Sequence, residues 1–289
     1  MRPWHCLILL LCMAGRSQAA GLADVTRPAL DAGSLAGAVL LVTDRDHTLL
    51  HEAAGSADLA SRRPMALDSL FWIASMTKPI TAAAVMILVD EGKVRLDEPV
   101  ARYLPEFGDT WVAVERDAGR MVLRRPARPI TVRDLLAHTS GLPFKSPVET
   151  PTLDQLPLAV VARSAAQLPL LFDPGTGYQY SNAGINTAGR IVEVVSGMPY
   201  EAFLEERILE PLGMTDTTFR PTAAQLARIA MSHRRGDSGG LVPVPIDLPP
   251  LNVATFRERI SGGTNQGRSR DATREEVHCG ADHREAPRG

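Results

Sequence analysis

Residues 71–81 read Phe-Trp-Ile-Ala-Ser-Met-Thr-Lys-Pro-Ile-Thr and lead into an alanine-rich apolar run that ends before Gly92. This composition predicts a largely buried helix with Gly92 as its stop. Pro79 has no amide hydrogen and is tolerated only in the first turn of a helix, so the helix is expected to begin near Ser75. The segment therefore predicts a helix whose first turn carries Ser75 and Lys78 on one face.

Ser75 and Lys78 are residue types that serve as a nucleophile and its base. At a helix N-terminus the serine hydroxyl faces the positive end of the helix dipole, and the serine N–H is free to donate to a developing oxyanion. The same dipole and partial burial disfavour the charged form of Lys78, so its amine could act as a base near neutral pH. The alternative is an ordinary capping serine beside a surface lysine, and these residues alone leave both open.

A second polar segment, Tyr180-Ser181-Asn182, begins a helical pattern that runs to Ser196. Either Ser181 or Asn182 is expected to cap that helix. A Tyr180 hydroxyl close to the predicted nucleophile would pass protons between it and a leaving group, and the Asn182 amide could hold a substrate carbonyl or orient the lysine. The sequence alone does not place the two segments together in space.

Four segments of the chain match the sequence motifs of one known protein family, in the same order along the chain. They are residues 71–81, 135–142 (Leu-Leu-Ala-His-Thr-Ser-Gly-Leu), 174–182 (Pro-Gly-Thr-Gly-Tyr-Gln-Tyr-Ser-Asn) and 210–217 (Glu-Pro-Leu-Gly-Met-Thr-Asp-Thr). In this pattern the chain resembles the serine β-lactamase-like superfamily, most closely its class C β-lactamase, D-alanyl-D-alanine peptidase and EstB-type esterase branch. Four segments in register are much more specific than an isolated Ser-x-x-Lys pair.

The resemblance implies an α/β fold of the α+β kind, with a partial antiparallel sheet and a mainly helical region from about Thr77 to Thr255. It implies that Ser75 is acylated, that Lys78 and Tyr180 share the general-base role, and that Asn182 contacts the acyl group. The expected activity is that of a serine hydrolase cleaving an amide, β-lactam or ester through an acyl-serine intermediate, without metal or organic cofactor. The alternative is a catalytically impaired penicillin- or peptidoglycan-peptide-binding protein, or an inactive truncated product.

The third motif of the superfamily, Lys-Thr-Gly or His-x-Gly on a central strand, is not evident. Gly262-Gly263-Thr264 and His278-Cys279-Gly280 imitate it, but neither lies in an alternating apolar run. Residues 257–289 are polar and are expected to form a disordered tail. We therefore expect an incomplete domain over residues 20–256, shortened or divergent after about residue 256, without the C-terminal strands.

The N-terminus has the pattern of a cleavable signal peptide. Residues 1–5 carry a positive charge, residues 6–14 are apolar, and residues 17–20 are mostly small. The apolar run is too short for a stable membrane span, so a secreted or periplasmic protein cleaved after Ala19 or Ala20 is expected. Cleavage would leave Cys279 as the one cysteine, and no internal disulfide is expected.

The composition of the chain limits the classes of molecule that it is expected to bind. The net charge of -2, the 45% hydrophobic content and the mean hydropathy of -0.04 indicate a globular chain and argue against nucleic-acid binding. No glycine-rich phosphate loop and no His/Cys cluster with metal-ligand spacing is present in the sequence. The expected partner is a small-molecule or peptide acyl substrate, and the oligomeric state stays open.

One histidine and two pairs of acidic residues are not expected to take part in the chemistry. By the resemblance, His138 belongs to a structural loop rather than to the chemistry. Asp90-Glu91 and Asp97-Glu98 are interpreted as a solvated helix end and turn rather than as a glycosidase-like carboxylate pair.

Periodicity and turn residues predict the remaining elements. A short helix is expected over 22–30 and antiparallel hairpins over 37–43 with 48–55 and 111–115 with 120–123. Further helices are expected to begin at 131–136 and to cover 156–167, 182–196 and 200–209, and residues 243–250 are expected to be extended or looped.

Overall fold

The structure, a computed structural model, describes residues 21–117, 119–149 and 156–244. All of them belong to the first of two units into which the chain divides, Met1–Pro249. The predicted signal peptide, the predicted tail and the segment in which a third motif was sought lie outside the described residues.

An antiparallel sheet follows the first helix, α1 (Leu22–Asp31). It consists of β1 (Gly37–Thr43), β2 (Thr48–Asp58) and β3 (Arg63–Pro64), in the order β1-β2-β3. The turn between β1 and β2 closes where the Asp44 N–H donates to the His47 carbonyl at 3.0 Å. The predicted hairpin is confirmed, with β2 three residues longer than expected.

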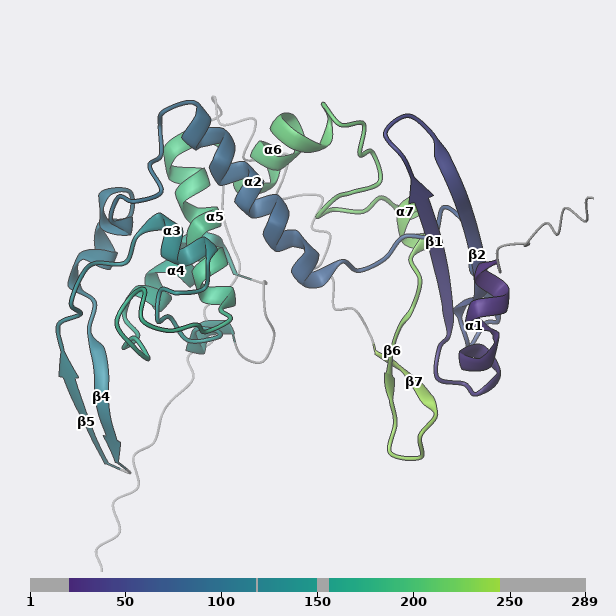
Figure 1. Ribbon diagram of the computed structural model, residues 1–289, viewed down its shortest axis with the longest axis horizontal. Helices are drawn as coiled ribbons and strands as arrows, with labels where there is room; N and C mark the ends of the chain where they lie inside the picture. The colour runs from purple at the N-terminus through teal and green to yellow at the C-terminus, as the bar shows by residue number, and fades with distance from the viewer. Residues whose placement is uncertain (1–20, 118, 150–155, 245–289) are drawn as a thin grey trace, which may run out of the picture. The chain divides into compact units, whose positions relative to one another are not determined.

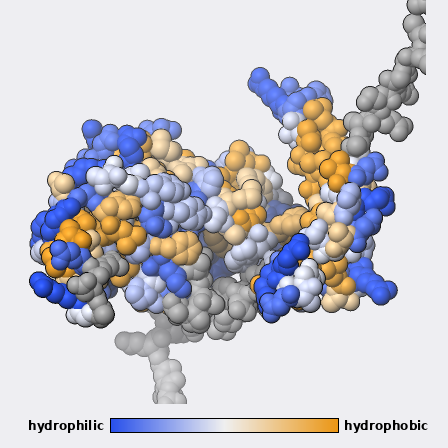
Figure 2. All heavy atoms as spheres, turned by 60° about the horizontal axis from the view of Figure 1, so that its bottom comes forward, coloured by the Kyte–Doolittle hydropathy of each residue, from blue (hydrophilic) through white to orange (hydrophobic). Residues whose placement is uncertain are grey.

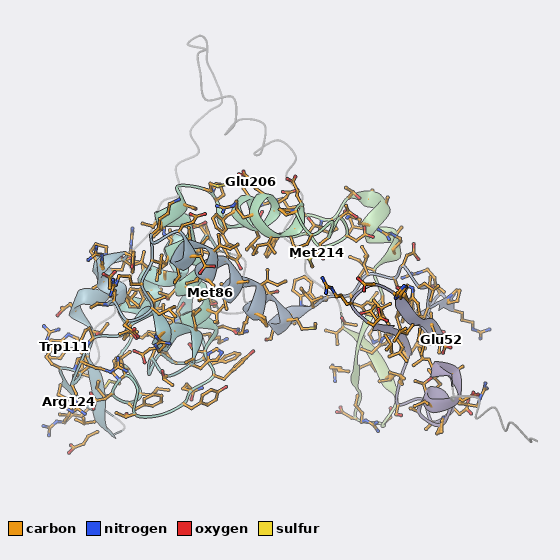
Figure 3. All side chains as sticks on the ribbon, turned by 45° about the horizontal axis from the view of Figure 1, so that its top comes forward. Glu52, Met86, Trp111, Arg124, Glu206 and Met214 are labelled. Atoms are coloured by element: carbon orange, nitrogen blue, oxygen red, sulfur yellow. The ribbon has the colours of Figure 1, made fainter. Side chains whose placement is uncertain are left out.

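Helix α1 is attached to this sheet through Glu52, which is labelled in Figure 3. The backbone N–H of Leu22, the first residue of α1, donates to the Glu52 carboxylate at 2.5 Å. Around β1 and β2, apolar side chains also reach the surface (Figure 2), where Leu41 and Leu49 are 56% and 62% exposed. The part of the chain that the structure describes leaves these strands partly open to solvent.

The larger core lies among the helices α2 (Thr77–Asp90), α3 (Val132–Leu136), α4 (Leu158–Ala166), α5 (Asn182–Ser196) and α6 (Tyr200–Leu204). Helix α5 packs against each of the other four, and Figure 1 shows it beside α2. Fully buried side chains join them, among them Val85, Leu88, Leu135, Ile191 and Phe203. Burial of each such side chain stabilises the folded state by about 1.5–3 kcal/mol. Because α5 contacts all four of the other helices, it is central to this core.

Short single-turn segments connect the helices. Four of them are 3-10 turns, at Ala74–Met76, Val100–Arg102, Pro105–Asp109 and Pro147–Glu149. A fifth, at Glu205–Leu209, is of π type. The π turn explains why the helix expected over 200–209 is regular only to Leu204. The predicted helices α3, α4 and α5 are confirmed within two residues, and α5 has the predicted bounds.

Two hairpins interrupt the region that was expected to be mainly helical. The first, β4 (Val112–Asp117) with β5 (Arg120–Arg124), confirms the second predicted hairpin. The second, β6 (Ser232–Arg235) with β7 (Leu241–Val244), was not predicted, and neither was helix α7 (Ala223–Arg228). Within the described residues, helix α7 is therefore followed by the β6–β7 hairpin, and residues 245–255 of the expected helical region lie outside the described chain.

Asp134 forms the most strongly bonded buried carboxylate of the helical region. It accepts two hydrogen bonds from Arg128, at 2.6 and 2.9 Å, and others from Thr131 and Thr139. Burial by itself would raise the pKa of Asp134, but the Arg128 guanidinium and the threonine donors outweigh burial and lower it to about 2. The Thr131 and Asp134 side chains also form a capping box at the start of α3, the helix that was expected to begin at 131–136.

We expect Asp134→Asn to lower the free energy of unfolding by about 2 kcal/mol at pH 7. Because the folded pKa lies below the ordinary value of 3.8, this stabilisation is complete above pH 3.8 and disappears as the pH falls to about 2. Urea unfolding of the two proteins between pH 7 and pH 2 measures the effect. The matched control is Asp97→Asn, since that carboxylate pairs with Arg133 but is 78% exposed. A loss for Asp134→Asn no larger than for the control would contradict this account.

Candidate active site

Ser75 lies in a single turn, Ala74–Met76, that runs directly into α2. This placement confirms the expected helix start, and Gly92, with φ +71°, follows the C-terminal end of the helix. Ala74 has φ +44°, a left-handed conformation that is strained for a residue with a Cβ, and strained residues of this kind cluster at functional sites. The side chain of Ser75 is exposed, so a substrate can reach its hydroxyl.

Lys78 lies one turn further along, on the same face. Its Nζ donates a hydrogen bond to Ser75 Oγ at 3.0 Å, and the same nitrogen is 4.8 Å from the centre of the Tyr180 ring. The Ser75 hydroxyl and then the Lys78 ammonium lower the pKa of the Tyr180 phenol. The structure thus brings Tyr180 close to Ser75 and Lys78, which lie about a hundred residues earlier in the sequence.

Asn182, two residues after Tyr180, is the first residue of α5. Ser181, not Asn182, is the N-cap, since Ser181 Oγ accepts from the Gly184 N–H at 2.9 Å. The Asn182 N–H donates to the Phe144 carbonyl, while Asn182 Oδ1 is buried and has no hydrogen-bond partner among the described residues. A buried amide oxygen without a partner is costly, which makes Asn182 a candidate acceptor for a ligand N–H.

The loop that carries Tyr180 is tied to its surroundings at its beginning. The guanidinium of Arg124, labelled in Figure 3, donates to the Asp173 carboxylate, and together with the Ala127 N–H it lowers the pKa of Asp173 to about 2. The Gly175 N–H then donates to the Thr139 carbonyl at 2.8 Å. The β4–β5 hairpin and the segment after α3 therefore both fix the loop.

Sequence reasoning did not identify the aromatic surroundings of Tyr180. The Phe144 ring stacks on the Tyr180 ring with 6.3 Å between centres, and the His138 ring lies at 4.7 Å on a tilt of 36°. Tyr178 meets His138 edge-on at 5.9 Å. Phe144 lies in an irregular segment without periodicity, so no sequence signal marked it. His138 does belong to a loop, as expected.

The other candidates have structural partners. Glu91 pairs with Lys93 and Arg207, and Asp97 pairs with Arg133, so these carboxylates support the surface interpretation rather than a catalytic pair. Within residues 21–117, 119–149 and 156–244, no group of three or more His, Cys, Asp or Glu side chains has the arrangement of a metal site. Across the same described ranges, no helix has the length and apolar character needed to cross a membrane.

Comparison with known proteins gives consistent matches. The family model described as Beta-lactamase matches residues 22–272. Protein Rv1367c of Mycobacterium tuberculosis (strain ATCC 25618 / H37Rv) is 42% identical over 239 residues, covering 80% of this chain and 59% of that protein. Esterase EstB of Burkholderia gladioli is 36% identical over 233 residues, covering 76% and 56%.

Among solved structures, EstCE1, a hydrolase with promiscuous acyltransferase activity, superposes with a TM-score of 0.65 and 29% identity. The match covers 79% of this chain and 60% of that one. The chain thus spans about 60% of the length of these relatives.

We expect Lys78→Met to raise the pKa of the Tyr180 phenol toward its ordinary value of 10, because the substitution removes a hydrogen bond and a positive charge. Absorbance at 295 nm during alkaline titration measures phenolate formation. Subtracting the curve of a Tyr180→Phe variant isolates one of the four tyrosines. Lys93→Met, which removes an exposed lysine paired with Glu91, serves as the control. An identical Tyr180 titration in the Lys78→Met and Lys93→Met proteins would refute the assigned contact.

Proposed function

The chain belongs to the beta-lactamase family, and we propose that it is a serine hydrolase that cleaves an acyl bond through an acyl-Ser75 intermediate. The observation that carries this proposal is the Ser75, Lys78 and Tyr180 group, in which one hydroxyl contacts both an ammonium and a phenol of lowered pKa. A nucleophile beside a group able to accept its proton is the arrangement that acyl transfer requires.

In the proposed mechanism, Ser75 Oγ attacks the carbonyl carbon of the substrate while its proton passes to the Tyr180 oxygen. The lowered pKa of the phenol favours the phenolate that accepts this proton, and the positive charge of Lys78 stabilises it. Tyr180 then returns the proton to the leaving group as the bond between the acyl carbon and the leaving group breaks. A water molecule repeats the sequence in the second half, releasing the acid and restoring the Ser75 hydroxyl.

Two other groups would stabilise the reacting acyl group. The Ser75 N–H lies in the first turn of the helical segment, where the helix dipole favours negative charge, and we propose it as an oxyanion donor. Asn182 has a buried side-chain oxygen without a partner in the described structure, and we propose that it accepts a hydrogen bond from the substrate or from Lys78.

Among esters, amides and β-lactams, we propose an ester as the substrate, supported by exposed apolar side chains near the site residues in the sequence and by the names of the relatives. Trp72, Met76 and Tyr178 are exposed by 53%, 70% and 67% near Ser75 or Tyr180 in the sequence, and such side chains suit an apolar acyl or alcohol group. The relatives named above include an esterase and a hydrolase with acyltransferase activity. Amides and β-lactams are the alternative substrates, because attack by Ser75 on their carbonyl carbon would give the same acyl-serine intermediate.

We also propose the organisation expected from the sequence. Residues 1–19 would direct export to the periplasm or the medium and be removed, residues 20–256 would form the hydrolase domain, and residues 257–289 would form a polar tail. An N-terminal sequence beginning at Ala20 or Gly21 on protein recovered from outside the cytoplasm would support the first part, and retention of residues 1–19 would contradict it.

We expect a fluorophosphonate probe to label the full chain at Ser75 and the protein to hydrolyse p-nitrophenyl esters of short acids. Ser75→Ala should abolish labelling and lower ester turnover at least about a thousandfold, because it removes the nucleophile. Ser61→Ala is the matched control, since Ser61 is an exposed serine that donates only to Asp58 among the described contacts.

Labelling that persists in Ser75→Ala would refute the proposal. Absent labelling, together with non-covalent binding of a fluorescent penicillin that survives in Ser75→Ala, would favour a binding protein instead. Peptide mapping of the labelled wild-type chain identifies the modified residue directly.

A further inference from the structure

His138 contacts the Tyr180 segment at three points. Its carbonyl accepts from the Gln179 N–H at 2.9 Å, its Nδ1 accepts from the Ser181 N–H at 3.1 Å, and its ring lies 4.7 Å from the Tyr180 ring. Residues 179 and 181 flank Tyr180, so the first two bonds hold its peptide on both sides. We propose that His138 is a positioning residue that sets the Tyr180 phenol against Ser75; this inference rests on the proposed function.

The backbone of His138 makes the double contact possible. Its φ of +59° is left-handed, a conformation in which His, Asn and Asp are enriched among residues with a side chain. In this conformation the carbonyl and the imidazole of the same residue both meet the segment 179–181. The next residue is held in turn, because the Thr139 N–H donates to the Asp134 carbonyl at 2.9 Å and Thr139 Oγ donates to the Asp134 carboxylate.

The bond from Ser181 requires a particular protonation state. A nitrogen that accepts a hydrogen bond carries no proton, so His138 is neutral with its proton on Nε2. Burial first, and the charge of Lys78 second, lower the pKa of His138 below its ordinary value of 6.5. The titratable groups that face the ring are Lys78 from α2 and Tyr178 and Tyr180 from the loop. Burial and the Lys78 charge both disfavour an imidazolium, and the hydrogen bond from the Ser181 N–H needs the neutral ring.

Protonation would turn the acceptor into a donor. The imidazolium would point an N–H at the Ser181 N–H, and the bond that fixes one side of Tyr180 would be lost. Because the pKa of His138 is lowered, this happens only as the pH falls below 6.5. His138 therefore makes the position of the phenol depend on pH on the acidic side.

Because His138 Nδ1 already accepts a hydrogen bond, His138 is placed to position Tyr180 and not to act as the general base. A general base needs a free nitrogen within reach of the proton that it removes. Here Nδ1 is bonded to the Ser181 N–H, and it is Lys78, not His138, that bonds Ser75 Oγ. His138 acts on the reaction through Tyr180.

The test compares His138→Asn with His138→Ala in the full chain. An asparagine Oδ1 occupies nearly the place of Nδ1, accepts a hydrogen bond without titrating near neutral pH, and tolerates a left-handed backbone. Alanine removes the acceptor. The control is His51→Ala, since His51 is an exposed histidine on β2. For each protein, kcat and KM for ester hydrolysis and the rate of fluorophosphonate labelling are measured from pH 5 to pH 9, with the thermal midpoint as a check of folding.

At pH 7.5 we expect His138→Ala to lower kcat and the labelling rate about tenfold to a hundredfold with KM changed less than about threefold, as for a misplaced catalytic group. His138→Asn should recover most of the rate. In the wild type, kcat should fall below pH 6.5 as His138 protonates, and in His138→Asn this inflection should be missing. Equal rates in His138→Ala and wild type, or no recovery and an unchanged pH profile in His138→Asn, would overturn the proposal.

A measurement without turnover keeps this inference separate from the proposed function. In ¹⁵N NMR of the wild-type chain, the Ser181 amide signal should shift with the same pKa as the His138 ring and should stay fixed in His138→Asn. An amide signal that ignores the ring would refute the positioning role even in an active enzyme. Absent Ser75 labelling would refute the proposed function, while a Ser181 signal that follows the His138 ring would still support the positioning of Tyr180.

Discussion

The packing of α2 on α5 is the constraint on which the site depends. Ser75 and Lys78 come with α2, whereas Tyr180 and Asn182 come with the start of α5, so the two halves meet because the helices share a buried interface. Val85 and Leu88 of α2 and Ile191 of α5 belong to that core. A further bond of 2.6 Å, between the Thr81 and Tyr200 hydroxyls, joins α2 to α6 beside α5. The free energy that holds the reactive groups together therefore comes largely from apolar burial some distance from them.

Local strain and ion pairs refine what the helices bring together. Ala74 and His138 both have left-handed backbones, one directly before Ser75 and the other against Tyr180. Such conformations persist only where the surroundings hold them. The Arg128–Asp134 pair holds the segment after α3, and the Arg124–Asp173 pair holds the loop before Tyr180. Asp134 of the first pair lies four residues before His138, and Asp173 of the second lies at the start of the loop that carries Tyr180.

Local sequence rules account for much of the framework. Pro79 placed the start of α2, the cap-like start at Thr131 placed α3, and the apolar period of residues 182–196 placed α5 with its observed bounds. The meeting of Ser75 with Tyr180 could be expected from family resemblance alone, because no local rule reports a contact across a hundred residues. The β6 strand escaped prediction since Ser-His-Arg-Arg has no alternating apolar pattern. The contact of His138 Nδ1 with the Ser181 N–H depends on a left-handed backbone that sequence does not reveal.

The central claim is that Lys78 and Tyr180 act as one unit on the Ser75 hydroxyl, and a double-mutant cycle tests it most directly. The rate of Ser75 phosphonylation would be measured in the wild type, Lys78→Met, Tyr180→Phe and the double variant under one set of conditions. Residues that work as a unit give strongly non-additive losses, so the double variant should be about as slow as the slower single variant. Losses that multiply, so that the double variant shows the product of the two single effects, would mean that the lysine and the tyrosine act independently and would contradict the account.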